Sequence, residues 1–156
     1  VVFSDFECAK CAATHTVLEE VAKSYGSKVR YVARHFPLEQ HVNAYRAAQA
    51  AEAAFEQGKY WEYSKLLFDN QKNLAEDRLR ELATEAGLDR QKFDAALASG
   101  KLASSVDRDL NDGTRIGVTG TPSVYVNGRA VAEDTAEPRG QRPGGGRGDA
   151  AGDGGE

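Results

Sequence analysis

The sequence predicts an α/β fold in which a block of helices interrupts two strand-containing parts. Three observations predict it. The first 36 residues have the pattern of a strand–helix–strand unit. The middle of the chain shows helical periodicity throughout. A strand, a tight turn and a return strand then follow at residues 123–131.

The bulk composition is that of a single globular domain. The chain has 156 residues and a net charge of −4, which gives no reason to expect nucleic acid as a partner. No apolar run approaches the ~18 residues needed to span a bilayer. The chain contains no methionine and starts inside the apolar run VVF. We therefore expect a mature or truncated product whose targeting segment is not in this chain.

The first unit begins with a short strand at Val1–Phe3 and continues into a helix at residues 8–25. Gly26 is a plausible end for that helix. Residues 29–36 then alternate between apolar and polar side chains, and Pro37 follows them. This alternation predicts a strand that ends at the proline.

The middle of the chain predicts five helices. Four are expected at residues 41–57, 59–69, 75–86 and from about 101, and Asp89 is placed to cap the remaining one. The first of them is expected to bury one apolar face, formed by Ala44, Ala47, Ala48, Ala51 and Phe55.

The last part combines a hairpin and a tail. Ser123–Val126 predicts a strand, and Asn127-Gly128 favours a type I′ turn because both positions of that turn need positive φ. Residues 140–156 contain eight of the 16 glycines and no large apolar side chain. Such a segment cannot bury enough surface to offset its ordering entropy, so we expect it to be disordered.

Cys8 and Cys11, the only cysteines, form a CxxC pair that has three interpretations. A structural disulfide closing so short a loop adds roughly 2 kcal/mol, which a domain of this size does not need. A zinc site would need two more ligands, and the three histidines have no finger-like spacing to the pair. A redox site fits the context better, because the pair follows a predicted strand and opens a predicted helix.

In the redox interpretation the two cysteines have different roles. Cys8 is expected to face solvent near the positive end of the helix, which stabilises a thiolate. Lys10 adds a positive charge beside it. Cys11, one turn later, can attack a mixed disulfide and release the partner. We therefore expect Cys8 to be the nucleophile and Cys11 the resolving thiol.

Several motifs together resemble the DsbA-like thioredoxin-fold oxidoreductases. They are FSDFECAKC, RHFPL, QGKYWEYSKLLFDNQ, the GLD…F…L.SG run and GVTGTPSVYVNGR, which occur in the family's order over about residues 1–130. The resemblance implies a thioredoxin-like fold with an all-helical insertion. On this basis residues 1–36 form the first half of the core, 37–116 the insertion, 117–132 the second half, and 133–156 a disordered Gly-rich tail.

The resemblance also implies the rest of the site. Thr121-Pro122 is expected to face the cysteine pair with a cis peptide bond and to bind substrate backbone. The implied activity is exchange of disulfides with protein substrates in the oxidising direction, outside the cytoplasm, with no metal and no cofactor. A membrane redox partner would recharge the site, and we expect a monomer.

The sequence departs from the family in two ways. Ala9 stands where many members have proline, which leaves the redox potential open. The C-terminal helix of the fold is apparently missing, so we expect an apolar sheet face to be exposed. Asp5 and Glu7 could help move protons during exchange, or they could make Cys8 less acidic and so oppose Lys10, or they could be solvated loop carboxylates.

Two alternatives to a free-standing enzyme remain open. The chain could be a redox domain appended to a membrane protein. It could also be a non-catalytic binding module that keeps the fold without turnover.

Overall fold

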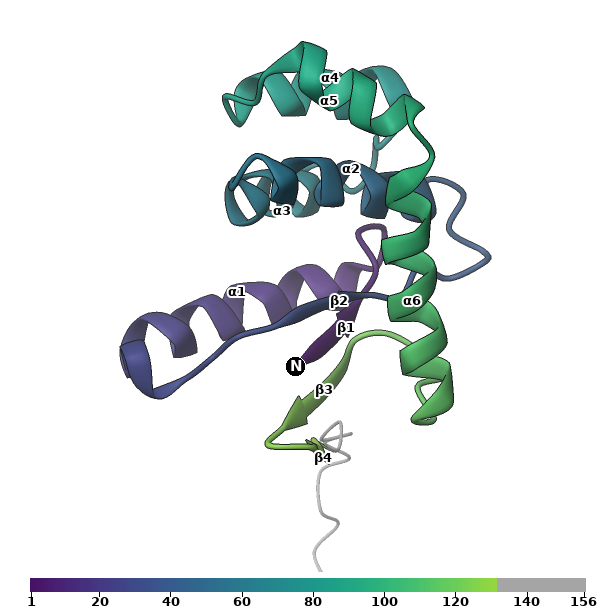
Figure 1. The fold of residues 1–156 in the computed structure, drawn as a ribbon. Helices are drawn as coiled ribbons and strands as arrows, with labels where there is room; N and C mark the ends of the chain where they lie inside the picture. The colour runs from purple at the N-terminus through teal and green to yellow at the C-terminus, as the bar shows by residue number, and fades with distance from the viewer. Residues whose placement is uncertain (132–156) are drawn as a thin grey trace, which may run out of the picture.

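The computed structural model describes residues 1–131. In chain order its elements are β1 (Val2–Ser4), α1 (Ala9–Tyr25), a 3₁₀ turn (Gly26–Lys28), β2 (Ala33–His35), α2 (Ala44–Glu56), α3 (Tyr60–Asp69), α4 (Glu76–Glu85), α5 (Arg90–Ala98), α6 (Lys101–Arg115), β3 (Ser123–Val126) and β4 (Arg129–Ala130). Figure 1 shows α4 and α5 as one layer, α2 and α3 as the next, and α1 with the sheet as a third. Helix α6 begins beside the layer of α2 and α3 and runs along one side of that layer and of the sheet.

The sheet has the strand order β2-β1-β3-β4. Strand β1 pairs in parallel with β2, placing Phe3 opposite Arg34, and antiparallel with β3, placing Phe3 opposite Ser123. A parallel pair needs a crossover, and α1 provides it. Asn127 and Gly128 have φ values of 49° and 79° in the turn between β3 and β4. The predicted strand–helix–strand unit and the predicted hairpin are therefore both confirmed.

The predicted extent of the second strand is wrong. Residues 29–36 were expected to be extended and paired, but β2 covers only Ala33–His35. Its partner β1 is itself three residues long, so there is little backbone for the earlier residues to pair with. One further hydrogen bond remains, from Val2 N to Val32 O at 2.9 Å.

The main hydrophobic core lies between the helices of the insertion. Its large side chains, Tyr63, Leu67, Leu79, Leu82 and Phe93, are all 0% exposed. Tyr63 satisfies its hydroxyl by donating to Leu79 O at 2.9 Å. Helix α2 contributes seven buried alanines, and such small side chains let α3, α5 and α6 approach its backbone closely.

Helix α6 joins the insertion to the sheet. Gly113 faces the rings of Phe3 and Phe36, and a Cβ added there would lie 2.8 Å from Phe36 Cδ2. One turn earlier, the Asp109 carboxylate pairs with Arg34 and accepts from His35 N at 3.0 Å. The predicted domain limits at 36/37 and 116/117 remain predictions, because α6 contacts both parts.

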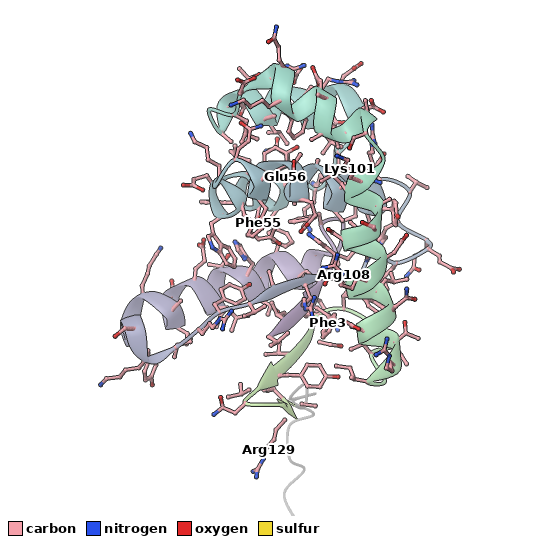
Figure 2. All side chains as sticks on the ribbon, viewed as in Figure 1. Phe3, Phe55, Glu56, Lys101, Arg108 and Arg129 are labelled. Carbon is pink, nitrogen blue, oxygen red and sulfur yellow. The ribbon has the colours of Figure 1, made fainter. Side chains whose placement is uncertain are left out.

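Beside α6, the sheet borders an open hollow of about 1050 Å³. Phe3, Tyr31, Phe55, Trp61 and Tyr125 are among its lining residues. Phe55 is 65% exposed, so its predicted burial with the alanines of α2 is wrong. It is the next-to-last residue of α2, and Figure 2 shows it on the side of α2 that faces the sheet layer.

The expectation that an apolar sheet face is exposed stays a prediction, and the hollow describes only residues 1–131. The predicted absence of a C-terminal helix and the predicted disorder of residues 133–156 lie outside the described residues. Among the helices that the structure describes, none has the length and apolar character needed to cross a membrane.

Candidate active site

The two cysteines lie where β1 gives way to α1. Cys8 is the N-cap residue of α1, with φ −85° and ψ 116°, and Cys11 lies in its first turn. Both are free thiols. Cys8 is partly exposed, whereas Cys11 is 0% exposed. An attacking thiolate from outside can therefore reach only the first sulfur of the pair.

The backbone of Cys8 forms the N-terminal end of α1. Cys8 N donates to Asp5 O at 3.1 Å, and Cys8 O accepts from Cys11 N at 3.0 Å. The first turn of α1 contains no acidic residue. The positive end of the helix is therefore not neutralised from within the helix, an environment that favours a thiolate.

Burial raises the pKa of the Cys11 thiol to about 12, although contacts with the Asp5 backbone and the Thr121 side chain act in the opposite direction. At neutral pH Cys11 is therefore a protonated thiol. The pair is strongly asymmetric, with an accessible sulfur at the helix end and a buried sulfur behind it.

The loop before β3 completes the site from 113 residues away. The Thr121-Pro122 peptide bond is cis. Cys8 Sγ donates a hydrogen bond to Thr121 O at 3.5 Å. Antiparallel pairing of β3 with β1 brings this loop beside the cysteine loop. Lys10, Thr121 and Pro122 also line one shallow groove of about 380 Å³.

Asp5 holds the cysteine loop to the loop that follows β2. Its side chain is 1% exposed and accepts from Glu7 N at 2.7 Å and from Leu38 N at 2.7 Å. His41 Nδ1 lies 2.8 Å from the same carboxylate. The interpretation of Asp5 as a solvated loop carboxylate is therefore wrong, and a role in tuning Cys8 remains a prediction.

Glu7 also connects the cysteine loop to the loop between β2 and α2. Its carboxylate accepts from Asn43 N at 2.9 Å and from Asn43 Nδ2 at 3.1 Å. The Asp5 and Glu7 carboxylates thus both accept hydrogen bonds from backbone amides, which sequence reasoning did not anticipate.

Gln71 is the contact residue that sequence reasoning missed. Its Nε2 lies 2.7 Å from Phe6 O and 2.8 Å from Cys8 O, so the insertion contacts the carbonyl oxygen of Cys8. A single sequence holds no signal for a hydrogen bond between residues 63 positions apart.

The three histidines have other partners. His15 Nδ1 lies 3.3 Å from the Tyr31 hydroxyl, and burial lowers the pKa of His15, so its ring is neutral at pH 7. His35 Nε2 lies 3.0 Å from Glu52 Oε1, and His41 pairs with Asp5. In the described part of the chain, no three His, Cys, Asp or Glu side chains form a group that could hold a metal ion.

Comparison with known proteins gives a family match over most of the chain. A family model described as thioredoxin matches residues 1–140. The chain is also 39% identical over 131 residues to a Na(+)/H(+) antiporter NhaA 1 of Mycolicibacterium vanbaalenii, covering 82% of this chain and 21% of that protein. A Na(+)/H(+) antiporter NhaA of Herminiimonas arsenicoxydans is 37% identical, with coverages of 84% and 21%. The chain thus spans about a fifth of the length of these curated relatives.

Solved structures show the same fold. A thioredoxin-like oxidoreductase from Silicibacter pomeroyi matches with a TM-score of 0.75 and 25% identity, covering 83% of this chain and 74% of that one. The thiol-disulfide exchange protein alpha-DsbA2 from Wolbachia pipientis matches with a TM-score of 0.75, 18% identity and coverages of 83% and 70%. A periplasmic thioredoxin-like protein from Salmonella enterica matches with a TM-score of 0.69, 18% identity and coverages of 83% and 71%.

Proposed function

The chain belongs to the thioredoxin family, and on that premise we propose that it exchanges disulfides with protein substrates through Cys8 and Cys11. The thioredoxin-like fold predicted from sequence is confirmed, and it supports an oxidoreductase. One observation carries the finer proposal: an accessible thiol at a helix N-cap lies against Thr121 O while its partner thiol is buried one turn on.

The proposed reaction begins from a Cys8–Cys11 disulfide. A substrate thiolate attacks Cys8 Sγ, the S–S bond breaks, and Cys11 leaves as a thiolate that takes up a proton. A second substrate thiolate then attacks the substrate sulfur of the mixed disulfide and releases Cys8. Two electrons pass from the substrate dithiol to the cysteine pair, and the substrate gains one disulfide.

Access decides which sulfur is attacked. Cys11 is 0% exposed, so an incoming thiolate meets Cys8. The groove lined by Lys10, Thr121 and Pro122 lies beside that sulfur and could bind the substrate backbone. We propose the oxidising direction, because a stabilised Cys8 thiolate favours the reduced form of the enzyme. Reoxidation would then need a membrane redox partner.

The curated relatives favour one protein context. They are named as Na(+)/H(+) antiporters, and this chain matches only about a fifth of their length. We propose that the chain is the redox domain of such a longer membrane protein and that it works on the extracytoplasmic side. The alternative is a binding module without turnover. Such a module would not oxidise a reduced substrate, so an activity assay distinguishes the two.

The first experiment measures oxidation of a reduced, unfolded protein substrate by the oxidised chain. Wild type is expected to form substrate disulfides, and Cys8→Ser to lose that activity. Cys11→Ser cannot form the Cys8–Cys11 disulfide and should also fail to oxidise the reduced substrate. Given a disulfide-bonded substrate instead, its Cys8 thiolate should attack that disulfide and accumulate a mixed disulfide, because no resolving thiol is present. Equal activity of wild type and Cys8→Ser would overturn the proposal, and inactivity of wild type would favour the binding module.

The direction is decided by equilibration against glutathione buffers, with the thiols read by alkylation. A potential near ~−120 mV supports an oxidase, and one near ~−270 mV supports a reductase. The second value would contradict the oxidising direction while leaving disulfide exchange intact.

A further inference from the structure

A glutamine of the insertion makes a direct hydrogen bond to the backbone of Cys8. Gln71 follows α3 and donates from Nε2 to Phe6 O at 2.7 Å and to Cys8 O at 2.8 Å. We propose that Gln71 is a positioning residue for the chemistry of Cys8, holding the 6–8 loop so that the thiol stays at the N-terminus of α1. The proposal rests on the disulfide exchange proposed above.

The loop that Gln71 holds has little regular structure of its own. Strand β1 ends at Ser4 and α1 begins at Ala9, so Cys8 is fixed by loop contacts. The Cys8 carbonyl already accepts from Cys11 N at 3.0 Å and from Ala12 N at 3.3 Å. Gln71 adds a third donor to the same oxygen. The direction of this carbonyl fixes the Cys8 backbone, and with it the position of the thiol relative to the helix end.

Gln71 is itself firmly held. The turn after α3 is closed by hydrogen bonds from Asn70 N to Leu66 O at 3.1 Å and from Asn73 N to Asn70 O at 2.9 Å. Phe68 of α3 packs against Phe6 with ring centroids 4.9 Å apart. The insertion thus contacts the cysteine loop through the Phe68 ring and the Gln71 side-chain amide. A positioning residue needs such a rigid support.

The chemistry requires a donor at this place. Both recorded partners of Nε2 are carbonyl oxygens, which accept and cannot donate. A glutamate of the same shape would place a carboxylate against two acceptors. A methionine of similar length would leave both carbonyls without this donor. In either variant the loop loses its tie to the insertion, and the thiolate loses its fixed place over the helix amides.

The test is the pH profile of Cys8 alkylation in the full, reduced chain, since buried Cys11 does not compete. Gln71→Met carries no charge change and is expected to slow alkylation near neutral pH by about three- to ten-fold, as expected for lost hydrogen bonds. Gln71→Glu should slow it further, because it adds a negative charge. The matched control is Gln91→Met, at an exposed position of α5.

Thermal melting distinguishes positioning from a purely structural role. A variant that melts earlier but keeps the wild-type alkylation profile would overturn the proposal. A shift in Gln71→Glu without one in Gln71→Met would also overturn it, because charge alone would then explain the effect. Alkylation needs no substrate protein, so a shifted profile in a chain that fails to exchange disulfides would refute the function and retain the positioning role.

Discussion

The insertion and the sheet half of this protein differ in the size of their buried hydrophobic cores. Tyr63, Leu79 and Phe93 in the insertion are 0% exposed, within a core that spans α2 to α5. The buried cluster at the sheet contains only Phe3, Phe36 and Val118, and it borders the open hollow. The candidate site lies at the junction of these two parts. Most of the clustered buried side chains lie in the helical part, whereas the two cysteines of the candidate site lie in the part with the smaller core.

The largest effect on the free energy of unfolding is expected in the insertion core, where a buried and an exposed phenylalanine can be compared. Phe93 is 0% exposed and Phe55 is 65% exposed. Phe93→Ala is expected to lower the free energy of unfolding by about 3–5 kcal/mol, since it removes buried surface and leaves a cavity. Phe55→Ala should change it by no more than about 0.5 kcal/mol. Urea unfolding measures both, and similar losses in the two variants would abolish the contrast.

The second test loosens the junction between α6 and the sheet. Gly113→Val forces a side chain against the rings of Phe3 and Phe36, which lie 2.8–3.0 Å from an added Cβ. Overpacking of this kind should cost about 1–3 kcal/mol of unfolding free energy. The control is Gly120→Val, where an added Cβ meets nothing within 4 Å. If the two variants are equally stable, α6 does not depend on this close approach.

The third test uses the burial of Cys11. In the fold its pKa is raised from 9.0 to about 12 by burial, so above pH 9 the unfolded chain has lost this proton while the folded chain keeps it. Stability must therefore fall as pH rises, by about 1 kcal/mol between pH 8 and pH 10. Urea unfolding of the reduced protein should show this loss in wild type and Cys8→Ala. In Cys11→Ala the loss should be smaller, and an equal loss there would contradict the prediction.

The smallest effect concerns the hollow beside the sheet. A dye that fluoresces on apolar surface is expected to bind the folded, intact chain, because Phe55 and Trp61 are 65% and 40% exposed there. Phe55→Ser should weaken that binding, and Val17→Ser on exposed α1 should not. Absence of dye binding together with a sharp cooperative melt would show that the sheet face is covered in solution.

Features with local causes could be predicted from the sequence. Asp89 caps α5 by accepting from Lys92 N at 3.1 Å, and Asn127-Gly128 makes the turn. Cys8 and Cys11 lie at the start of the helix that follows the first strand, as the sequence around them predicts. Each of these depends on side chains within a few residues, so the relevant information is contiguous in the chain.

Features with distant causes could not be predicted. Phe55 has the same helical spacing as the buried alanines, yet at the end of α2 it is 65% exposed, with its ring edge-to-face against Tyr60 at a centroid distance of 6.4 Å. From the sequence, Asp5 could be a solvated loop carboxylate. In the structure Leu38 N and His41 Nδ1 contact its carboxylate. Gln71 ends one of the motifs that resemble the family, but its contact with Cys8 could not be predicted, because its two acceptors are backbone carbonyls that every residue carries.

The sequence by itself determined the order of the elements, the cysteine pair at a helix start and the resemblance that assigned Thr121-Pro122 to it. The tertiary structure decided which carboxylates hold the loops, how deeply Cys11 is buried and that the insertion grips the carbonyl of Cys8. The physical reason is the range of the forces involved. Helix starts and turns are set by neighbouring residues, whereas burial and long-range hydrogen bonds exist only once distant segments pack together.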